Sequence, residues 1–191
     1  LLNGTVQCWG YNSFGQLGDN STTHSSVPIP VSGITTATAV TGGGHHTCAL
    51  LLNGTVQCWG YNSFGQLGNN STDTSFVPVS VNGITTATAV TGGGLHTCAL
   101  LSDGTVQCWG YNSSGQLGNA TTTDSFVPVS VSGINTATAV TGGFFHTCAL
   151  LSDHTVQCWG YNSSGQLGNA TTTDSFVPVS VSGINTATAV T

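Results

Sequence analysis

The sequence predicts an all-β protein of the propeller type, a repeat array with about one four-stranded blade per 50 residues. The 191-residue chain repeats itself with a period of 50 residues, without insertion or deletion. Its hydrophobic stretches are short, rich in β-branched and aromatic residues, and separated by turn signals. Helical periodicity is absent. Such a period is typical of solenoids, propellers and arrays, in which one supersecondary unit is used many times.

The period divides the chain into repeats 1–50, 51–100 and 101–150 and an incomplete repeat 151–191. Residues 101–141 and 151–191 differ only where Gly104 is replaced by His154. The chain has no Met, and its last repeat stops before a Gly-Gly-x-x-His-Thr-Cys-Ala-Leu segment. We therefore expect it to be a slice of a longer array.

Four strands are expected in each unit. Written for one unit they cover 127–131, 137–141, 146–151 and 155–160, and the long loop 162–175 follows. Each strand ends at glycine, serine or asparagine, which are typical turn residues. Pro128 and its equivalents place the first of these strands at a sheet edge, because proline donates no ladder hydrogen bond.

The third and fourth strands are predicted to form a hairpin around pairs such as Asn53-Gly54. A two-residue turn would set Cys48 opposite Trp59. A three-residue loop ending in a left-handed glycine would instead set Cys48 opposite Cys58. We favour the second geometry because it explains a cysteine on both strands of each complete hairpin. His154 would then have to accept a positive φ.

Six of the seven cysteines recur as pairs, with one cysteine on each strand of a predicted hairpin. The expected disulfides are Cys48–Cys58, Cys98–Cys108 and Cys148–Cys158, and Cys8 is left unpaired in this chain. Paired cysteines predict an oxidising setting, extracellular or at the cell surface. Two alternatives stay open, namely reduced thiols buried in the core and a zinc site. His46, Cys48 and Cys58 could supply such a site, but their spacing matches no standard zinc framework, so we expect no metal.

Composition excludes several classes of function. The chain has no Lys and no Arg, and its only formal charges are six Asp, for a net charge of −6. Nucleic-acid binding and anionic membrane surfaces both depend on cations, so neither is an expected partner. No apolar run approaches the roughly 18 residues that a membrane helix needs, so membrane insertion is not expected.

No catalytic constellation is visible. A nucleophile elbow, a phosphate loop and paired carboxylates are all missing, so we expect neither an enzyme nor a cofactor. The recurring His46, His96 and His146 are interpreted as buried residues that bond to a neighbouring strand. The four tryptophans, as strand residues beside a cysteine, favour blade core, with a carbohydrate-stacking ladder as the alternative. They are Trp9, Trp59, Trp109 and Trp159.

Asn-x-Ser/Thr triplets are dense, and glycans would help to keep a nearly uncharged surface soluble. The glycosylation candidates are Asn20, Asn70, Asn119 and Asn169. Further triplets begin at Asn3, Asn53, Asn69, Asn112 and Asn162.

Two recurring motifs carry a family resemblance. One is Cys-Trp-Gly-x-Asn-Ser-x-Gly-Gln-Leu-Gly, seen at 8–18, and the other is Gly-Gly-x-x-His-Thr-Cys-Ala-Leu, seen at 42–50 in the form GGGHHTCAL. Together, over all four periods, they resemble the regulator of chromosome condensation repeat, most closely that of secreted bacterial members. The resemblance implies a β-propeller in which each repeat supplies about one blade, with seven blades in the typical ring. The founding member is a nucleotide exchange factor that docks on chromatin, but the uniform loops and absent cations here argue against both activities.

The sequence thus predicts a non-enzymatic extracellular or cell-surface scaffold with a structural, filament-forming or adhesive role. Near-identical repeats favour self-association into a fibre or a ring, because each interface can be reused along an axis. The alternatives are a protein-binding propeller of the exchange-factor type and a glycan-binding propeller.

Overall fold

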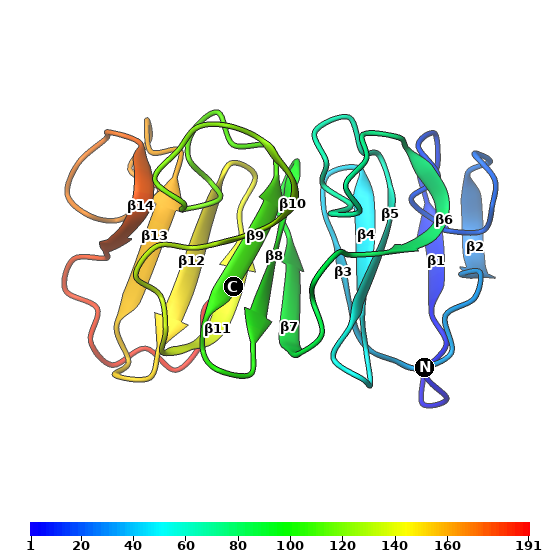
Figure 1. The fold of residues 1–191 in the computed structure, drawn as a ribbon, viewed down its shortest axis with the longest axis horizontal. Helices are drawn as coiled ribbons and strands as arrows, with labels where there is room; N and C mark the ends of the chain where they lie inside the picture. The colour runs from blue at the N-terminus through cyan, green and yellow to red at the C-terminus, as the bar shows by residue number, and fades with distance from the viewer.

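The computed structural model describes all of residues 1–191 and contains strands but no helix. Three four-stranded antiparallel sheets and one two-stranded sheet lie side by side (Figure 1). The all-β propeller-type prediction is confirmed. The strands are β1 (Gln7–Gly10), β2 (Ser25–Pro30), β3 (Ala37–Gly42), β4 (His46–Leu51), β5 (Val56–Gly60), β6 (Ser75–Ser80), β7 (Ala87–Gly92), β8 (His96–Leu101), β9 (Val106–Gly110), β10 (Ser125–Ser130), β11 (Ala137–Gly142), β12 (His146–Leu151), β13 (Val156–Gly160) and β14 (Ser175–Ser180).

The sheets are out of phase with the 50-residue period. Each complete sheet has the order β3-β4-β5-β6 or its equivalent, so it begins with the Ala-Thr-Ala-Val strand of one repeat and ends with the proline strand of the next. The strand at 125–130 therefore closes the sheet that precedes the one formed by 137–142, 146–151 and 156–160. Each blade draws its strands from two successive repeats, which ties the repeats together.

The hairpin register is the one that a three-residue loop gives. Cys48 lies opposite Cys58 on β4 and β5, and the same register recurs in the next two sheets. Gly54 closes the loop with φ +78°, a conformation that glycine adopts at no steric cost. His154 takes the same place with φ +67°, as the sequence predicts.

The proline strands β2, β6, β10 and β14 form the outer edges of their sheets. In β10 the register breaks between Ser125 and Val129, the interval that contains Pro128. Such a bulge lets a residue without an N–H lie in a strand without leaving a ladder bond unmade. The expectation of an edge strand is confirmed.

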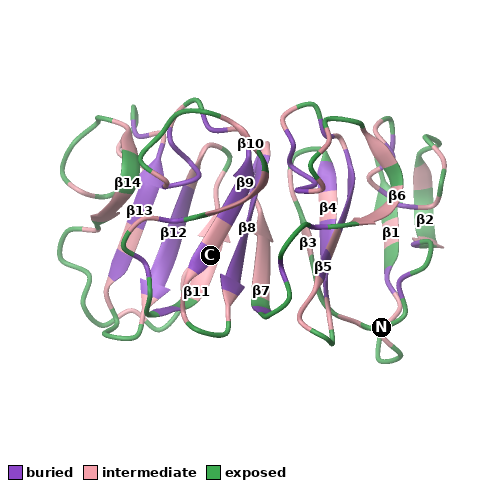
Figure 2. Cartoon of the chain, in the orientation of Figure 1, coloured by how far each residue is buried: buried purple, intermediate pink, exposed green.

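The core lies between neighbouring sheets, and the two middle strands of each sheet are the most buried (Figure 2). One core cluster contains both cysteines of the Cys98–Cys108 pair together with Leu100, Val106 and Trp159. Trp159 belongs to the following sheet, so each cluster is shared between two blades. Such burial of apolar area is the main force that holds the blades together.

The innermost strands β3, β7 and β11 contact one another, and glycine is essential there. The N–H of Gly44 donates to the carbonyl oxygens of Gly93 and Gly94 at 3.1 Å. A Cβ on Gly44 would lie only 2.6 Å from the Gly94 oxygen. The Gly-Gly pair of each repeat therefore allows the inner strands to approach one another closely.

Candidate functional site: an aromatic row across the blades

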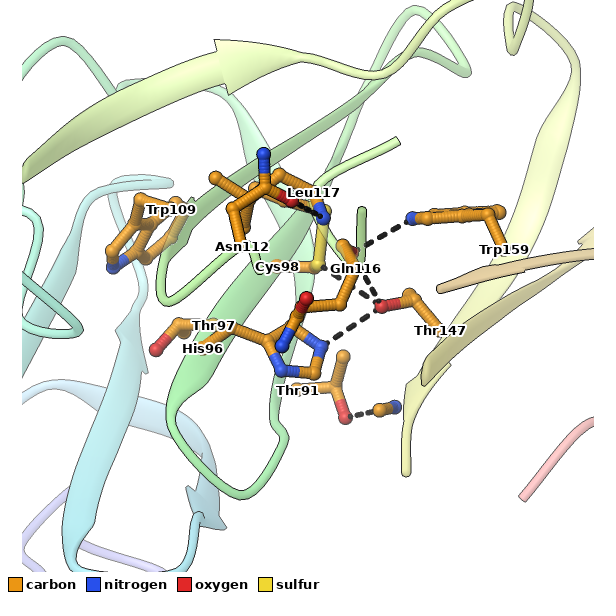
Figure 3. The surroundings of a disulfide bond; sticks show 12 residues. Thr91, His96, Thr97, Cys98, Trp109, Asn112, Gln116, Leu117, Thr147 and Trp159 are labelled. Carbon is orange, nitrogen blue, oxygen red and sulfur yellow. Dashed lines mark hydrogen bonds between the residues drawn. A yellow bond between two sulfur atoms is a disulfide. The ribbon is translucent and has the colours of Figure 1, made fainter. Parts of the chain in front are cut away.

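One glutamine backbone carbonyl joins each long loop to the next blade through two hydrogen bonds, an arrangement called here the glutamine carbonyl lock (Figure 3). The Gln116 oxygen accepts hydrogen bonds from Thr147 Oγ1 at 3.0 Å and from Trp159 Nε1 at 2.9 Å. Gln66 and Gln16 accept the same pair of bonds one and two repeats earlier. The loops that follow β1, β5 and β9 are thereby fixed as rigid surfaces.

His46 and His96 belong to this lock, as the sequence predicts, whereas the half-buried His146 makes no such bond, so the prediction is wrong for that residue. His96 Nε2 lies 2.9 Å from Thr147 Oγ1. Because the Thr147 hydroxyl already donates to Gln116, His96 must be the donor, which leaves its Nδ1 unprotonated and without a partner. Burial, with a contribution from the neighbouring histidines, lowers the pKa of His96 to about 3, and burial lowers that of His46 to about 4. These imidazoles are neutral structural groups shielded from any substrate.

The cysteines lie where the hairpin register brings them together. Disulfides join Cys48 to Cys58, Cys98 to Cys108 and Cys148 to Cys158. Cys8 is free, and burial raises the pKa of its thiol to about 11, so it is a poor nucleophile at neutral pH.

No group of three side chains of the kind that binds a metal is present, and no apolar helix of membrane-spanning length occurs.

The tryptophans do not form a stacking surface. Trp59, Trp109 and Trp159 are fully buried, and each indole N–H is bonded to the preceding loop. Only Trp9 is exposed, at 62%, since no preceding loop covers it in this chain. The stacking alternative therefore fails for the three buried tryptophans, because no ring face is free, and the core interpretation holds for them.

The long loop is built around a buried asparagine in each repeat. Asn112 is fully buried; its Oδ1 accepts from the Leu117 N–H at 2.9 Å, and its Nδ2 donates to the carbonyls of Thr121 and Thr123 at 3.0 Å. The Asn112 triplet is thus part of the core of the loop. An asparagine recurs at this position as Asn12, Asn62 and Asn162, and that recurrence was the signal in the sequence for this structural role.

The four glycosylation candidates lie in two settings. Asn20 and Asn70 are exposed at the loop surface, in left-handed conformation with φ +65° and +61°. Asn119 and Asn169 are half-buried, and the side-chain oxygen of Asn119 accepts from the Thr121 hydroxyl at 2.9 Å. The first pair presents its amide nitrogens to solvent most openly.

An aromatic row, which the sequence reading missed, crosses the ends of the strands beside these loops. Within it, Phe14 lies 4.9 Å from Tyr61 and Phe64 lies 4.8 Å from Tyr111, measured between ring centroids. Each phenylalanine also contacts the tyrosine of its own repeat at 6.3 Å. The aromatic row consists of Tyr11, Phe14, His45, Tyr61, Phe64, Tyr111, Phe145 and Tyr161, with neighbouring centroids 4.8 to 6.4 Å apart.

The row is a surface feature. Tyr11 is 53% exposed, His45 is exposed, and the other rings are half-buried. Between Tyr111 and Tyr161 a cleft of about 220 Å³ opens, lined also by Ser113, Ser114 and Phe145. Rigid aromatic rings that are partly exposed are typical of binding surfaces, because they bury much area at little entropic cost.

Comparison with known proteins decides the family. The regulator of chromosome condensation (RCC1) repeat matches residues 3–50, 53–100, 103–150 and 153–191. The chain belongs to the RCC1 repeat family. A second description of the RCC1 repeat matches 37–66, 87–116 and 137–166. A search of curated protein sequences finds no match.

Several solved structures share the fold. Human WBSCR16 superposes with a TM-score of 0.84 at 25% identity, over 94% of this chain and 49% of that one. Yeast RCC1 (Prp20), solved bound to Kap60, gives 0.82 at 20% identity, over 93% and 44%. Prp20p from Saccharomyces cerevisiae, described with its binding properties to Gsp1p and histones, gives 0.80 at 21%, over 93% and 46%. The chain thus spans slightly less than half the length of these proteins.

Proposed function

We propose that this RCC1 repeat chain is a non-enzymatic scaffold that binds other proteins through its aromatic row. Support comes from the location of five rings of the row, since Tyr11, Phe14, Tyr61, Phe64 and Tyr111 lie on the loops that the glutamine carbonyl bonds join to the next blade. A surface ordered before binding loses little conformational entropy when a partner docks. The neighbours Prp20 and Prp20p are described as bound to Kap60 and as binding Gsp1p and histones, so protein binding is known on this fold.

The single observation that carries the proposal is the row of partly exposed rings in an otherwise polar, weakly charged chain. Protein interfaces are enriched in tyrosine and phenylalanine and depleted of charge at their centres. Both conditions hold here, since four tyrosines lie in the row and charged residues make up only 3% of the chain.

The test is a peptide-display selection on the intact chain, with depletion on a row variant that carries Tyr61→Ser, Phe64→Ser and Tyr111→Ser. We expect selected peptides rich in aromatic residues that bind the wild-type chain and lose at least tenfold in affinity on the variant. A matched control replaces Thr85, Thr86 and Asn82 near the opposite ends of the strands with serine. Peptides that bind both variants equally, or a selection without enrichment, would overturn the proposal.

The setting and the assembly form a second part of the proposal. Three hairpin disulfides support an oxidising environment, extracellular or at the cell surface, where the scaffold could also associate with itself. Thiol alkylation of native material, unfolded in denaturant without a reductant and analysed by mass spectrometry, tests the first point, and alkylation of Cys8 alone is expected. Seven reactive thiols would contradict it. Light scattering of the same sample measures self-association.

Glycan binding is the second candidate, and the same row is its best location, because tyrosine faces also stack on pyranose rings. A glycan array probed with the wild-type chain and the row variant separates it from peptide binding. Glycan signals that disappear with the row variant, without any peptide selection, would favour a lectin.

A further inference from the structure

The three gaps between successive tyrosines in the aromatic row are filled differently. Phe14 lies in the gap between Tyr11 and Tyr61, and Phe64 lies in the gap between Tyr61 and Tyr111. In the third gap the equivalent residue is Ser114, whose small side chain leaves the cleft of about 220 Å³. One change of residue type at this position thus distinguishes a filled gap from an open one.

The floor of the cleft keeps the geometry of the first gap. Phe145 lies 6.1 Å from Tyr111 and 6.3 Å from Tyr161, between ring centroids. His45 takes the equivalent place in the first gap, 6.4 Å from Tyr11 and 6.3 Å from Tyr61. There the Phe14 ring lies over it at 5.1 Å. The third gap therefore has the same two walls and a ring as its floor, without the ring that covers it.

We propose that the cleft between Tyr111 and Tyr161 takes a phenylalanine side chain of a partner protein. This inference rests on the proposed function, since it names the anchor that the row would receive. The chain itself provides the template, because a phenyl ring already fills the equivalent gap at Phe14, over His45, and at Phe64, where Leu95 stands at the position of Phe145. The volume agrees with a single side chain, since small-molecule sites typically measure about 300–1,000 Å³. Buried aromatic anchors of this kind dominate the energy of protein interfaces.

The charges nearby indicate what surrounds this phenylalanine. The carboxylate of Asp124 accepts the Asn112 N–H at 2.7 Å, and that of Asp174 accepts the Asn162 N–H at 2.7 Å. In the first repeat the equivalent His24 stacks on Tyr11 at 4.8 Å, which places the two carboxylates beside the tyrosines that form the walls. No Lys or Arg of this chain opposes them. A partner phenylalanine flanked by lysines is therefore favoured over one flanked by acidic residues.

The experiment is a titration of the intact chain with the capped peptide Lys-Gly-Phe-Gly-Lys, followed by the ring signals of the tyrosines in NMR spectra. Control peptides replace the phenylalanine with alanine or the lysines with glutamate. Two protein variants form a matched pair. Ser114→Phe fills the cleft with the chain's own residue for that position, whereas Ser164→Phe makes the same change where no next tyrosine follows in this chain. Unchanged tryptophan indole signals verify that both variants are folded.

We expect the Phe peptide to bind the wild-type chain and the Ser164→Phe variant within twofold of each other, and Ser114→Phe to weaken it at least tenfold. The alanine and glutamate peptides should each bind at least fivefold more weakly. Binding that Ser114→Phe leaves unchanged but the row variant abolishes would overturn the cleft while the proposed function stands. Absence of saturable binding up to roughly 10 mM, or a pyranose that competes fully for the cleft, would also overturn it.

Discussion

The phenyl ring of Phe64 lies with its centroid 4.8 Å from that of Tyr111, a residue of the following repeat. This contact joins two blades at the surface, just as the Gln66 carbonyl joins them in the interior by accepting from Thr97 and Trp109. Successive repeats therefore contact each other both at the surface, through rings, and in the interior, through hydrogen bonds. The inner bonds fix the three loops that carry five rings of the row, namely Tyr11, Phe14, Tyr61, Phe64 and Tyr111.

Removal of one hydroxyl should test the glutamine carbonyl lock. Thr147→Val deletes the donor to Gln116 and leaves the His96 Nε2–H buried without an acceptor, which costs about 1–3 kcal/mol. We expect the free energy of unfolding, measured in urea, to fall by that amount. Thr138→Val is the matched control, because this exposed threonine makes only a 3.3 Å bond to the Leu150 carbonyl. Equal effects of the two substitutions would show that the lock contributes nothing.

Stability should fall as the solution becomes acidic. Burial lowers the pKa of His46 to about 4 and of His96 to about 3, below the ordinary value of 6.5. As the pH falls, the unfolded chain therefore takes up protons before the folded chain does. The free energy of unfolding is highest above pH 6.5 and decreases as the pH falls toward the folded pKa values. Between pH 6 and 4 each histidine should remove up to about 1.4 kcal/mol per pH unit. Urea unfolding as a function of pH measures the slope, and His96→Gln should reduce it. A flat profile would contradict the burial of neutral imidazoles.

The strained loop at His154 should be improved by the residue that stands in the other repeats. His154 has φ +67°, where a non-glycine residue costs about 1–2 kcal/mol. Part of that cost is offset by the 3.1 Å bond from its Nδ1 to the Ala187 carbonyl oxygen. His154→Gly should therefore raise the free energy of unfolding by up to about 1 kcal/mol. The reverse change, Gly104→His, should lower it by at least as much, since a Cβ there lies 2.8 Å from the Asn135 oxygen. Thermal unfolding of both variants provides the measurement, and a shift in the same direction for both would contradict this interpretation.

Glycan occupancy should follow exposure among the Asn-x-Ser/Thr triplets. Expression in a glycosylating secretory host, followed by peptide mass spectrometry, should find carbohydrate on Asn20 and Asn70. The buried Asn112 and Asn162 should stay unmodified, because their Nδ2 groups hold the long loops. Modification of Asn112 in folded protein would contradict the loop structure.

The sequence predicted the architecture because the information for it is local and is repeated four times. The cysteine pair and the Asn-Gly or Asp-Gly turn determine the hairpin register, and Pro128 marks the edge strand. The phase of the sheets relative to the repeats was not predictable in this way, since it depends on which neighbour each Pro strand joins.

The candidate site was harder to predict than the fold. Trp59 and Tyr61 are two residues apart, which would put them on one face of a continuous strand. However, β5 ends at Gly60 with φ +106°, so the alternation stops there. The Gln16 carbonyl then covers Trp59 while Tyr61 stays partly exposed. Because a contact 43 residues distant decides which aromatic residue is available, reading the strand alone selected the tryptophans.

The most direct test of the aromatic row uses the two sets of aromatic signals as reporter and control. All four tyrosines of the chain lie in the row, whereas three of the four tryptophans are fully buried away from it. Peptides from the display selection should therefore shift the tyrosine ring signals in NMR spectra and leave the indole N–H signals of Trp59, Trp109 and Trp159 unchanged. Saturable binding that leaves every tyrosine signal in place would contradict the account and place the binding surface elsewhere.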